Sequence, residues 1–293
     1  MISVCEMLPS DRSCLFTRNQ ENKSIATSAA VKTQVLGDST GVGFTPYSNA
    51  YLILILPHSI ITVSVVTALL PRLSNYVIDK KNDELTNSLV KAIRLIGIFT
   101  VPAALMFLAF GQLVANTLYF GISNADANYL GLTLSAFALG LIPVSINLVL
   151  LRGLNAFENL KSQVIGNFIM NLISIALSYL VASWFEPKWV TIGLAGIFTL
   201  HYFIGTGISF YLIRRHQVRL PLLSISLYYL RLILIFTLVL APIWLLRGEI
   251  PGGNLVSLLL VTSVSAVFYL FIAKLLKISE VTDLLKVIWS RKV

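Results

Sequence analysis

The chain of 293 residues is strongly apolar, with 56% hydrophobic and only 12% charged residues and a mean hydropathy of +0.83. A soluble domain carries about a quarter of charged residues, and a chain this apolar could not cover its core with polar surface. The composition therefore excludes a cytosolic enzyme, a disordered protein and a disulfide-rich secreted module. The net charge of +9 comes largely from Lys and Arg between apolar runs, which is typical of membrane proteins and does not indicate a nucleic-acid partner.

Residues 1–49 form a polar N-terminal segment that precedes the first long apolar run. The segment lacks the basic start and apolar core of a signal peptide, because Glu6, Asp11 and Arg12 lie near its beginning. Its richness in Ser, Thr, Asn and Gly predicts a loop or a poorly ordered tail. Both cysteines, Cys5 and Cys14, lie here without a metal-ligand spacing, so neither is expected to carry a function.

Seven apolar runs have about the length that a membrane-spanning helix needs, which is roughly 20 residues. The sequence therefore predicts an all-α integral membrane protein with about seven transmembrane helices. Pro102 lies inside the second run, where the loss of one backbone hydrogen bond predicts a tilt or a kink. The runs are Ala50–Leu70, Ala92–Phe120, Tyr129–Leu151, Val164–Trp184, Val190–Ile213, Tyr229–Leu246 and Leu255–Ala273.

The connections between the runs suggest how the chain is divided. Phe185–Trp189 and Arg247–Asn254 are short, so the helices that they join are expected to be hairpin neighbours. Tyr76–Lys91 is longer, polar and mixed in charge, which favours an interfacial helix. The segment Gln217–Tyr228 contains Pro221 and is interpreted as a boundary between a five-helix part, residues 50–216, and two additional helices with a basic tail, residues 217–293.

The distribution of Lys and Arg predicts the orientation in the membrane. Sixteen of these residues fall in or beside the connections on one side and in the C-terminal tail, whereas the opposite connections hold only Lys188 and Arg247. Because Lys and Arg concentrate in cytoplasmic loops, we expect the C-terminus in the cytoplasm. With seven spans, the N-terminal segment then lies outside.

Enzyme signatures are absent from the sequence. No metalloprotease, nucleophile-elbow, phosphate-loop or dinucleotide-binding motif occurs, and the predicted spans contain no paired carboxylates. The sequence therefore predicts a protein that is not an enzyme and that has neither a cofactor nor a metal site. His201 lies inside a predicted span; a histidine that is hydrogen-bonded between helices is the favoured interpretation, ahead of a functional group.

The first span contains several polar residues that a helix facing lipid does not need. Ser59 and Thr62 stand three residues apart, and Ser64 and Thr67 repeat this spacing, so each pair is expected to share a helical face. Such a face either lines a substrate cavity or contacts another helix closely. Pro57, which precedes His58, could break the helix beside a cavity. The candidate substrate-cavity residues are Pro57, His58, Ser59, Thr62, Ser64 and Thr67.

The fourth span carries Asn167 and Asn171, which stand four apart and are expected to share a face. Two amide oxygens could coordinate a cation, and two amides could also hold helices together. Helix contact is the favoured interpretation, and a cation site is kept as the alternative.

Two segments resemble a known family. Leu56–Ser64 together with Thr67–Ser74, which ends in Pro71, Arg72, Leu73 and Ser74, resembles the MurJ (MviN) family of lipid II flippases, most closely its actinobacterial members. Arg152–Ala156 resembles the Arg-Gly-Phe-Tyr-Ala segment after the tenth helix of that family. The order and orientation of the seven spans are similar to helices eight to fourteen of these fourteen-helix transporters, which belong to the multidrug/oligosaccharidyl-lipid/polysaccharide exporter superfamily.

The resemblance implies a mechanism, a substrate and a location. Two lobes rock around a central cavity and flip lipid II, the peptidoglycan precursor, across the bacterial cytoplasmic membrane. The last two helices then form a groove for the polyprenyl tail, and membrane lipids surround the lobe. Pro71, Arg72 and Arg152 are structural residues on the cytoplasmic side. Some relatives bind sodium through an Asn and an Asp four apart, a spacing that Asn167 and Asn171 match with Asn at the second position.

Three functions stay open at this point. The first is lipid II flipping as the C-terminal half of such a transporter, with an N-terminal lobe as the partner. The second is a flippase or exporter for another polyprenyl-linked sugar or a drug. The third is a membrane scaffold that does not transport, or an inactive fragment, which the sparse charge in the predicted cavity favours.

Overall fold

The computed structural model describes residues 23, 25, 27, 43–158, 160–246 and 253–275, and these residues form helices and short turns without a β-strand. The polar N-terminal segment and the C-terminal basic tail lie largely outside the described residues. Of the former, Lys23, Ile25 and Thr27 are helical, and Ile25 is buried. Among the residues that the structure describes, six helices are long and apolar enough to cross a membrane, and a bent pair can supply a seventh.

The first predicted span is one helix of 35 residues that contains a wider π-helical turn. It consists of α3 (Phe44–Pro57), η1 (His58–Val63) and α4 (Ser64–Ile78). The helix begins ahead of the predicted Ala50. Pro57 has no N–H group to donate, so the hydrogen-bond ladder is disturbed beside it, and a π-bulge is a common result of such a disturbance.

The second predicted span is α5 (Asn82–Leu118), and its irregular backbone lies at Phe110 (φ −123°, ψ 24°) rather than at the predicted Pro102. The prediction of an interfacial helix over Tyr76–Lys91 is wrong. The structure divides this segment between α4 and α5, with a turn at Asp79–Lys81. Within that turn Lys81 donates a hydrogen bond to Asp79, and this bond raises the pKa of Lys81.

The third predicted span, Tyr129–Leu151, is not one continuous helix. It is divided into α6 (Asn124–Ala138) and α7 (Leu141–Ala156), which are bent by 40°. Pro143 lies in the first turn of α7 and cannot donate a hydrogen bond to the carbonyl of Leu139, so the helical ladder stops there. At Gly140 an added Cβ would lie 2.9 Å from Thr199 Oγ1 of the helix Pro187–Arg215, and the bend thus brings the backbone close to that helix.

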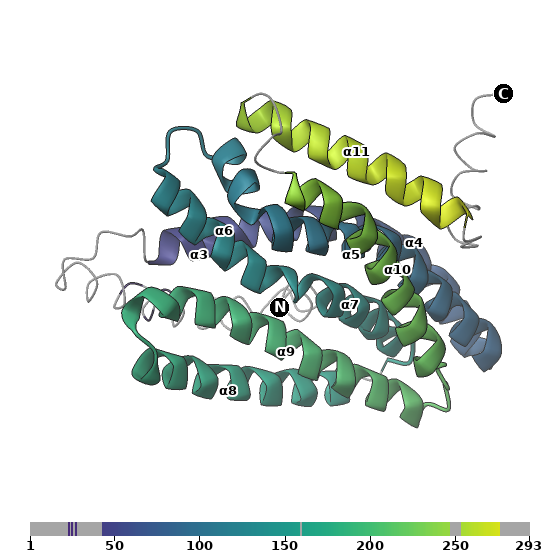
Figure 1. Cartoon of the computed structure of the whole chain (residues 1–293). Coiled ribbons are helices and arrows are strands. Elements are labelled where there is room, and N and C mark those ends of the chain that lie inside the picture. The colour runs from purple at the N-terminus through teal and green to yellow at the C-terminus, as the bar shows by residue number, and fades with distance from the viewer. Residues whose placement is uncertain are drawn as a thin grey trace.

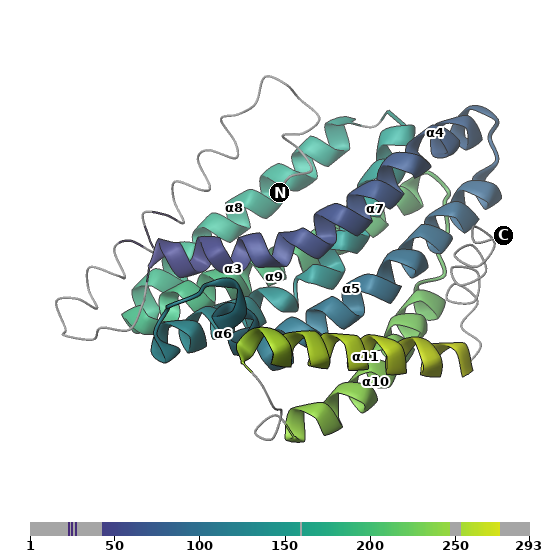
Figure 2. The same ribbon diagram turned by 90° about the horizontal axis from the view of Figure 1, so that it is seen from above.

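The remaining four spans are present as α8 (Leu160–Trp184), α9 (Pro187–Arg215), α10 (Leu222–Leu245) and α11 (Asn254–Leu275). Three of them have shifts of up to four residues at their ends. α10 begins seven residues before the predicted Tyr229, inside the segment Gln217–Tyr228 that the sequence assigned to a connection. Figures 1 and 2 show α8 at one side of the molecule and α10 with α11 at the other, while α9, α7 and α5 lie between them.

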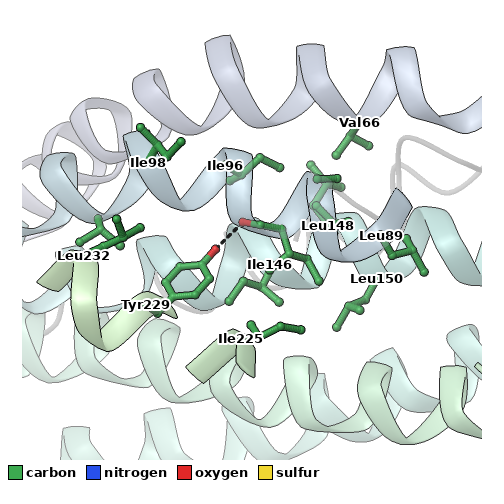
Figure 3. Packing of buried hydrophobic residues seen from close by; sticks show 14 of the residues in the cluster. Val66, Leu89, Ile96, Ile98, Ile146, Leu148, Leu150, Ile225, Tyr229 and Leu232 are labelled. Carbon is green, nitrogen blue, oxygen red and sulfur yellow. Dashed lines mark hydrogen bonds between the residues drawn. The ribbon is translucent and has the colours of Figure 1, made fainter. Parts of the chain in front are cut away.

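Two hydrophobic clusters fill the lobe. One joins α3, α6 and the first half of α9. The other joins α4, α5, α7, α10 and α11, and Figure 3 shows part of it around Tyr229. The two last helices therefore pack directly on the five-helix part. The division at residue 217 stays a prediction.

Tyrosines fasten the last two helices to α5. Tyr229 donates a hydrogen bond to the carbonyl of Ile93 (2.8 Å), as Figure 3 shows. On α11, Tyr269 donates to the carbonyl of Ile98 (3.2 Å). The ring of Tyr229 can approach α5 because residue 97 is glycine; an added Cβ there would lie 2.9 Å from Cζ of this ring.

Candidate functional site

The predicted polar face of the first span is split by the π-helical turn. His58 and Thr62 point inward and are buried, whereas Ser59, Ser64 and Thr67 are exposed. A π-helix bonds residue i to i+5 and is wider than an α-helix, so Ser59 comes to share a face with Ser64 instead of Thr62. The predicted pairing of Ser59 with Thr62 is therefore wrong.

The two inward side chains meet a serine of α7 that the sequence analysis did not identify. Ser145 Oγ lies 3.0 Å from His58 Nδ1 and 3.3 Å from Thr62 Oγ1. Its own hydrogen is donated to the carbonyl of Leu141 (2.8 Å). Because a hydroxyl has only one hydrogen, His58 must donate from Nδ1, and Thr62 also donates. We call these three residues the inner cluster.

The inner cluster joins two helices and does not face an open cavity. All three side chains are buried, and Thr62 and Ser145 have no exposed area. In a membrane, where polar groups find few other partners, such bonds fasten helices together, each by about 0.6 kcal/mol on average. For His58 and Thr62 the geometry thus favours helix contact, one of the two interpretations that the sequence left open.

The exposed hydroxyls of Ser59, Ser64 and Thr67 form a line on the outer surface of the lobe, which we call the outer stripe. Each donates to a carbonyl of its own helix, those of Ile55, Ile60 and Val63 respectively. The stripe is therefore satisfied without another helix, and its oxygens can still accept hydrogen bonds from outside. Farther along α4, Pro71 and Arg72 are exposed as well.

Asn167 and Asn171 lie half-buried on the face of α8 that continues through Ser174 and Ser178. Next along this face, Ser174 Oγ lies 2.7 Å from His201 Nδ1 of α9. His201 is thus hydrogen-bonded between helices, in agreement with the favoured interpretation. The described residues contain no group of three His, Cys, Asp or Glu side chains that could hold a metal ion. A cation site at the two asparagines stays a prediction.

Arg152 lies in the C-terminal half of α7, before its last turn, and is half-buried. Its Nε is buried and has no hydrogen-bond partner among the described residues. At the same end of the lobe, Arg94 of α5 donates to Ser224 Oγ of α10 (2.8 Å), and its guanidinium lies over the ring of Tyr228. These cations lie near the turns that the sequence assigns to the cytoplasm.

An apolar groove of about 220 Å³ runs between α5, α10 and α11. Pro102 and Met106 of α5, Phe236 of α10, and Ala266 and Tyr269 of α11 are among its walls. Ser265, also in the lining, is 1% exposed, and its Oγ has no hydrogen-bond partner among the described residues. The family resemblance implies a groove at the last two helices, and in the structure α5 forms a further wall of this one.

A bundle of apolar helices that are long enough to cross a membrane is the architecture of a multi-pass membrane protein. The family profile described as "Lipid II flippase MurJ" matches residues 24–277. The chain belongs to this family of flippases.

A solved structure described as "Lipid II flippase MurJ, inward closed conformation" is similar to the chain with a TM-score of 0.59 and 21% sequence identity. The match covers 79% of this chain and 47% of the solved chain. The chain therefore spans about half the length of that flippase. At this identity the similarity supports the fold.

Proposed function

We propose that the chain forms one lobe of a transporter that flips lipid II across the bacterial cytoplasmic membrane. Membership of the flippase family over residues 24–277 carries this proposal, and the similar fold of half of a solved flippase supports it. Alternating access requires two bundles that move against each other. The lobe would therefore act opposite a second lobe, the N-terminal one in the family resemblance.

The orientation that we propose places the turn at Asp79–Lys81 and the C-terminus in the cytoplasm. Lys80 and Lys81 lie in that turn, and Arg214 and Arg215 end α9 near the same end of the lobe. At the opposite end, where α8 is joined to α9, Lys188 in the first turn of α9 pairs with Glu186. This charge difference supports the orientation, since Lys and Arg stay preferentially on the cytoplasmic side.

The outer stripe is the surface that we propose for the substrate cavity. Exposed hydroxyls on an apolar helix are unfavourable against lipid, although bonding to the helix's own carbonyls reduces the cost. A wet cavity between two lobes would give Ser59, Ser64 and Thr67 a polar surrounding. Pro57 would act indirectly. It precedes the π-helical turn, and that turn places these three side chains on one side of the helix.

We propose that the polyprenyl tail lies in the apolar groove between α5, α10 and α11. The groove is lined almost entirely by carbon, which suits a hydrocarbon chain because burial of apolar surface is favourable. Thr262, Ser265 and Tyr269 are the side chains with hydroxyl groups in its lining, and a hydrocarbon tail needs none of them.

The test uses cells that carry the native gene under a depletable promoter. A lipid II-cleaving enzyme that cannot cross the membrane is added from outside, and the cleaved fraction is measured. Depletion is expected to lower that fraction, and re-expression of the protein is expected to restore it. An unchanged fraction on depletion would contradict the proposal and would favour the non-transporting scaffold.

The alternative substrate class needs a separate measurement. In vesicles that contain the purified protein together with its second lobe, labelled lipid II is flipped in the presence of other polyprenyl-linked sugars. We expect weak competition from these sugars. Faster movement of another polyprenyl-linked sugar than of lipid II would assign the lobe to that exporter class instead.

A further inference from the structure

A second and larger cavity, of about 590 Å³, lies where the C-terminal half of α5 meets α6 and the ends of α10 and α11. This volume is within the range of small-molecule sites, about 300–1,000 Å³. In the orientation that we propose, this end of the lobe faces the outside of the cell, opposite the turn at Asp79–Lys81 (Figures 1 and 2). Four carboxamides line the cavity, which we call the amide pocket: Gln112, Asn116, Asn128 and Asn254.

The amide pocket is separate from the sites that we propose for flipping. None of the described residues that line it also lines the apolar groove. It lies away from the outer stripe as well, because α5 stands between α4 and the last two helices (Figure 2). Neither the proposed tail site nor the proposed substrate cavity therefore accounts for this pocket.

The backbone of α5 is irregular at the wall of the amide pocket. The helix leaves helical geometry at Phe110, and both Phe110 and Gly111 line the pocket. At Gly111 an added Cβ would lie 2.6 Å from the carbonyl oxygen of Gly131 in α6, so the two backbones touch. Irregular backbone in a membrane helix is tolerated where it is buried in protein or lines a water-filled cavity. Its position here agrees with a hydrated polar pocket.

Backbone carbonyls beside the irregular turn add hydrogen-bond acceptors to the pocket. Ser135 of α6, which is part of the lining, lies with its Oγ 3.2 Å from the carbonyl oxygens of both Phe107 and Leu108. The same Oγ lies 2.9 Å from the carbonyl oxygen of Gly131. A hydroxyl has one hydrogen, and a carbonyl oxygen has two lone pairs. The carbonyl of Leu108, which is also a lining residue, therefore retains the capacity to accept a hydrogen bond from a ligand.

The lining identifies the chemical class of the ligand. A carboxamide both donates and accepts hydrogen bonds, and each hydroxyl of a sugar does the same. Among the described residues, the lining contains no Lys, Arg, His, Asp or Glu, so a charged group would find no opposite charge.

An aromatic side chain distinguishes a sugar from an uncharged peptide as the ligand. Trp244, in the last turn of α10, is part of the lining and is 41% exposed. Its indole is a flat apolar surface with a single donor. A sugar ring has a flat C–H face bordered by hydroxyls, which suits an indole beside carboxamides. A peptide backbone offers the hydrogen bonds without such a face.

We propose that the amide pocket binds an uncharged sugar unit of a glycan outside the membrane, without any part of a lipid chain. The carboxamides bond the sugar hydroxyls, and Trp244 packs against the ring. The proposal goes beyond flipping, because such binding needs neither a second lobe nor movement of a lipid across the membrane. An empty pocket therefore leaves the proposed transport untouched, and failure of transport leaves this site untouched.

The test uses the emission of Trp244 in the full chain, held in nanodiscs of phosphatidylcholine that are open on both faces. The other three tryptophans are replaced (W184F, W189F and W289F). Four compounds are titrated: the uncharged disaccharides cellobiose and N,N′-diacetylchitobiose, the anionic digalacturonic acid, and the uncharged peptide N-acetyl-trialanine amide. We expect at least one uncharged disaccharide to change the emission at a concentration about tenfold lower than digalacturonic acid and the peptide, the effect of a few net hydrogen bonds.

The double variant Gln112→Leu with Asn128→Leu is expected to remove this preference. Both side chains are exposed in the lobe, so the fold should persist, which circular dichroism checks. The matched control is Asn87→Leu, an exposed amide at the other end of α5, and it should keep the preference.

Three results would overturn the proposal. The first, which needs no pocket variant, is an absent response or equal responses to all four compounds in the protein with Trp244 as its only tryptophan. The second is a stronger response to digalacturonic acid or to the peptide, which would assign the pocket to another class of ligand. The third is a sugar preference that survives the double variant.

Discussion

The two sides of the π-helical turn carry the same kinds of side chain and use them differently. On the inner side, His58 and Thr62 give their hydrogens to Ser145 of another helix. On the outer side, Ser59 and Ser64 give theirs to carbonyls of their own helix. Polar residues in an apolar helix therefore indicate a site only after their partners are known. The inner cluster joins two helices, and the outer stripe is the surface that we propose for the substrate cavity.

The largest expected effect on folding comes from Ser145→Val. This change removes the hydroxyl that accepts hydrogen bonds from both His58 and Thr62. Two buried polar groups are then left without that acceptor, and the free energy of unfolding should fall by about 2 kcal/mol. Unfolding in detergent by increasing dodecyl sulfate, followed by circular dichroism, measures the loss. A stability equal to that of the parent protein would show that the inner cluster does not hold α7 to the first span.

A smaller loss is expected for Thr62→Val, which keeps the shape of the side chain and removes one donor. The expected cost is about 0.6 kcal/mol, the average for such a bond in a membrane. In the presence of Ser145→Val the same change should cost less, because the partner is already gone. Additive losses in the double variant would contradict a direct interaction between the two hydroxyls.

Substitutions in the outer stripe should reduce transport and leave the stability nearly unchanged, the reverse of those in the inner cluster. Ser59→Leu with Ser64→Leu is expected to change the stability by less than about 0.5 kcal/mol. In the assay with external cleavage of lipid II, however, the cleaved fraction should fall, because the cavity wall becomes apolar. Ser226→Leu, the same change at an exposed position of α10, is the control. Full transport by the double variant would mean that the outer stripe faces lipid.

The smallest effect on stability and on the flipping rate of each inserted molecule is expected for Arg152→Glu. This change weakens the positive charge at the proposed cytoplasmic end, so the yield of inserted protein should fall while each inserted molecule keeps its flipping rate. Accessibility of a cysteine introduced at Lys81 reports the orientation. Normal insertion together with lost flipping would assign Arg152 to the substrate instead.

The helices could be predicted from the sequence because a membrane allows little else. An apolar run of sufficient length must bond its backbone internally, and a helix does so. The break between α6 and α7 was missed, although Gly140 and Pro143 were visible as its signal. The position of the irregular turn at Phe110 has no comparable signal, because it depends on the contact of Gly111 with α6.

The candidate site was predictable only in part, for a geometric reason. The polar residues of the first span were identified from their spacing under an α-helical period, and the π-helical turn changes that period. Ser145 is 87 positions from His58, so no local pattern links them. Gln112, Asn128 and Asn254 line one cavity although they come from three helices, and only folding brings them together.

The tyrosine contacts on α5 have a mechanical consequence. Tyr229 and Tyr269 fix α10 and α11 to carbonyls of a helix that also packs against α4, α6 and α7. If the lobe rotates during transport, the apolar groove between α5, α10 and α11 moves with it as part of one rigid body. Spin labels on α5 and α10 should therefore keep one separation throughout transport, and the polyprenyl tail that we propose for the groove would move together with these helices.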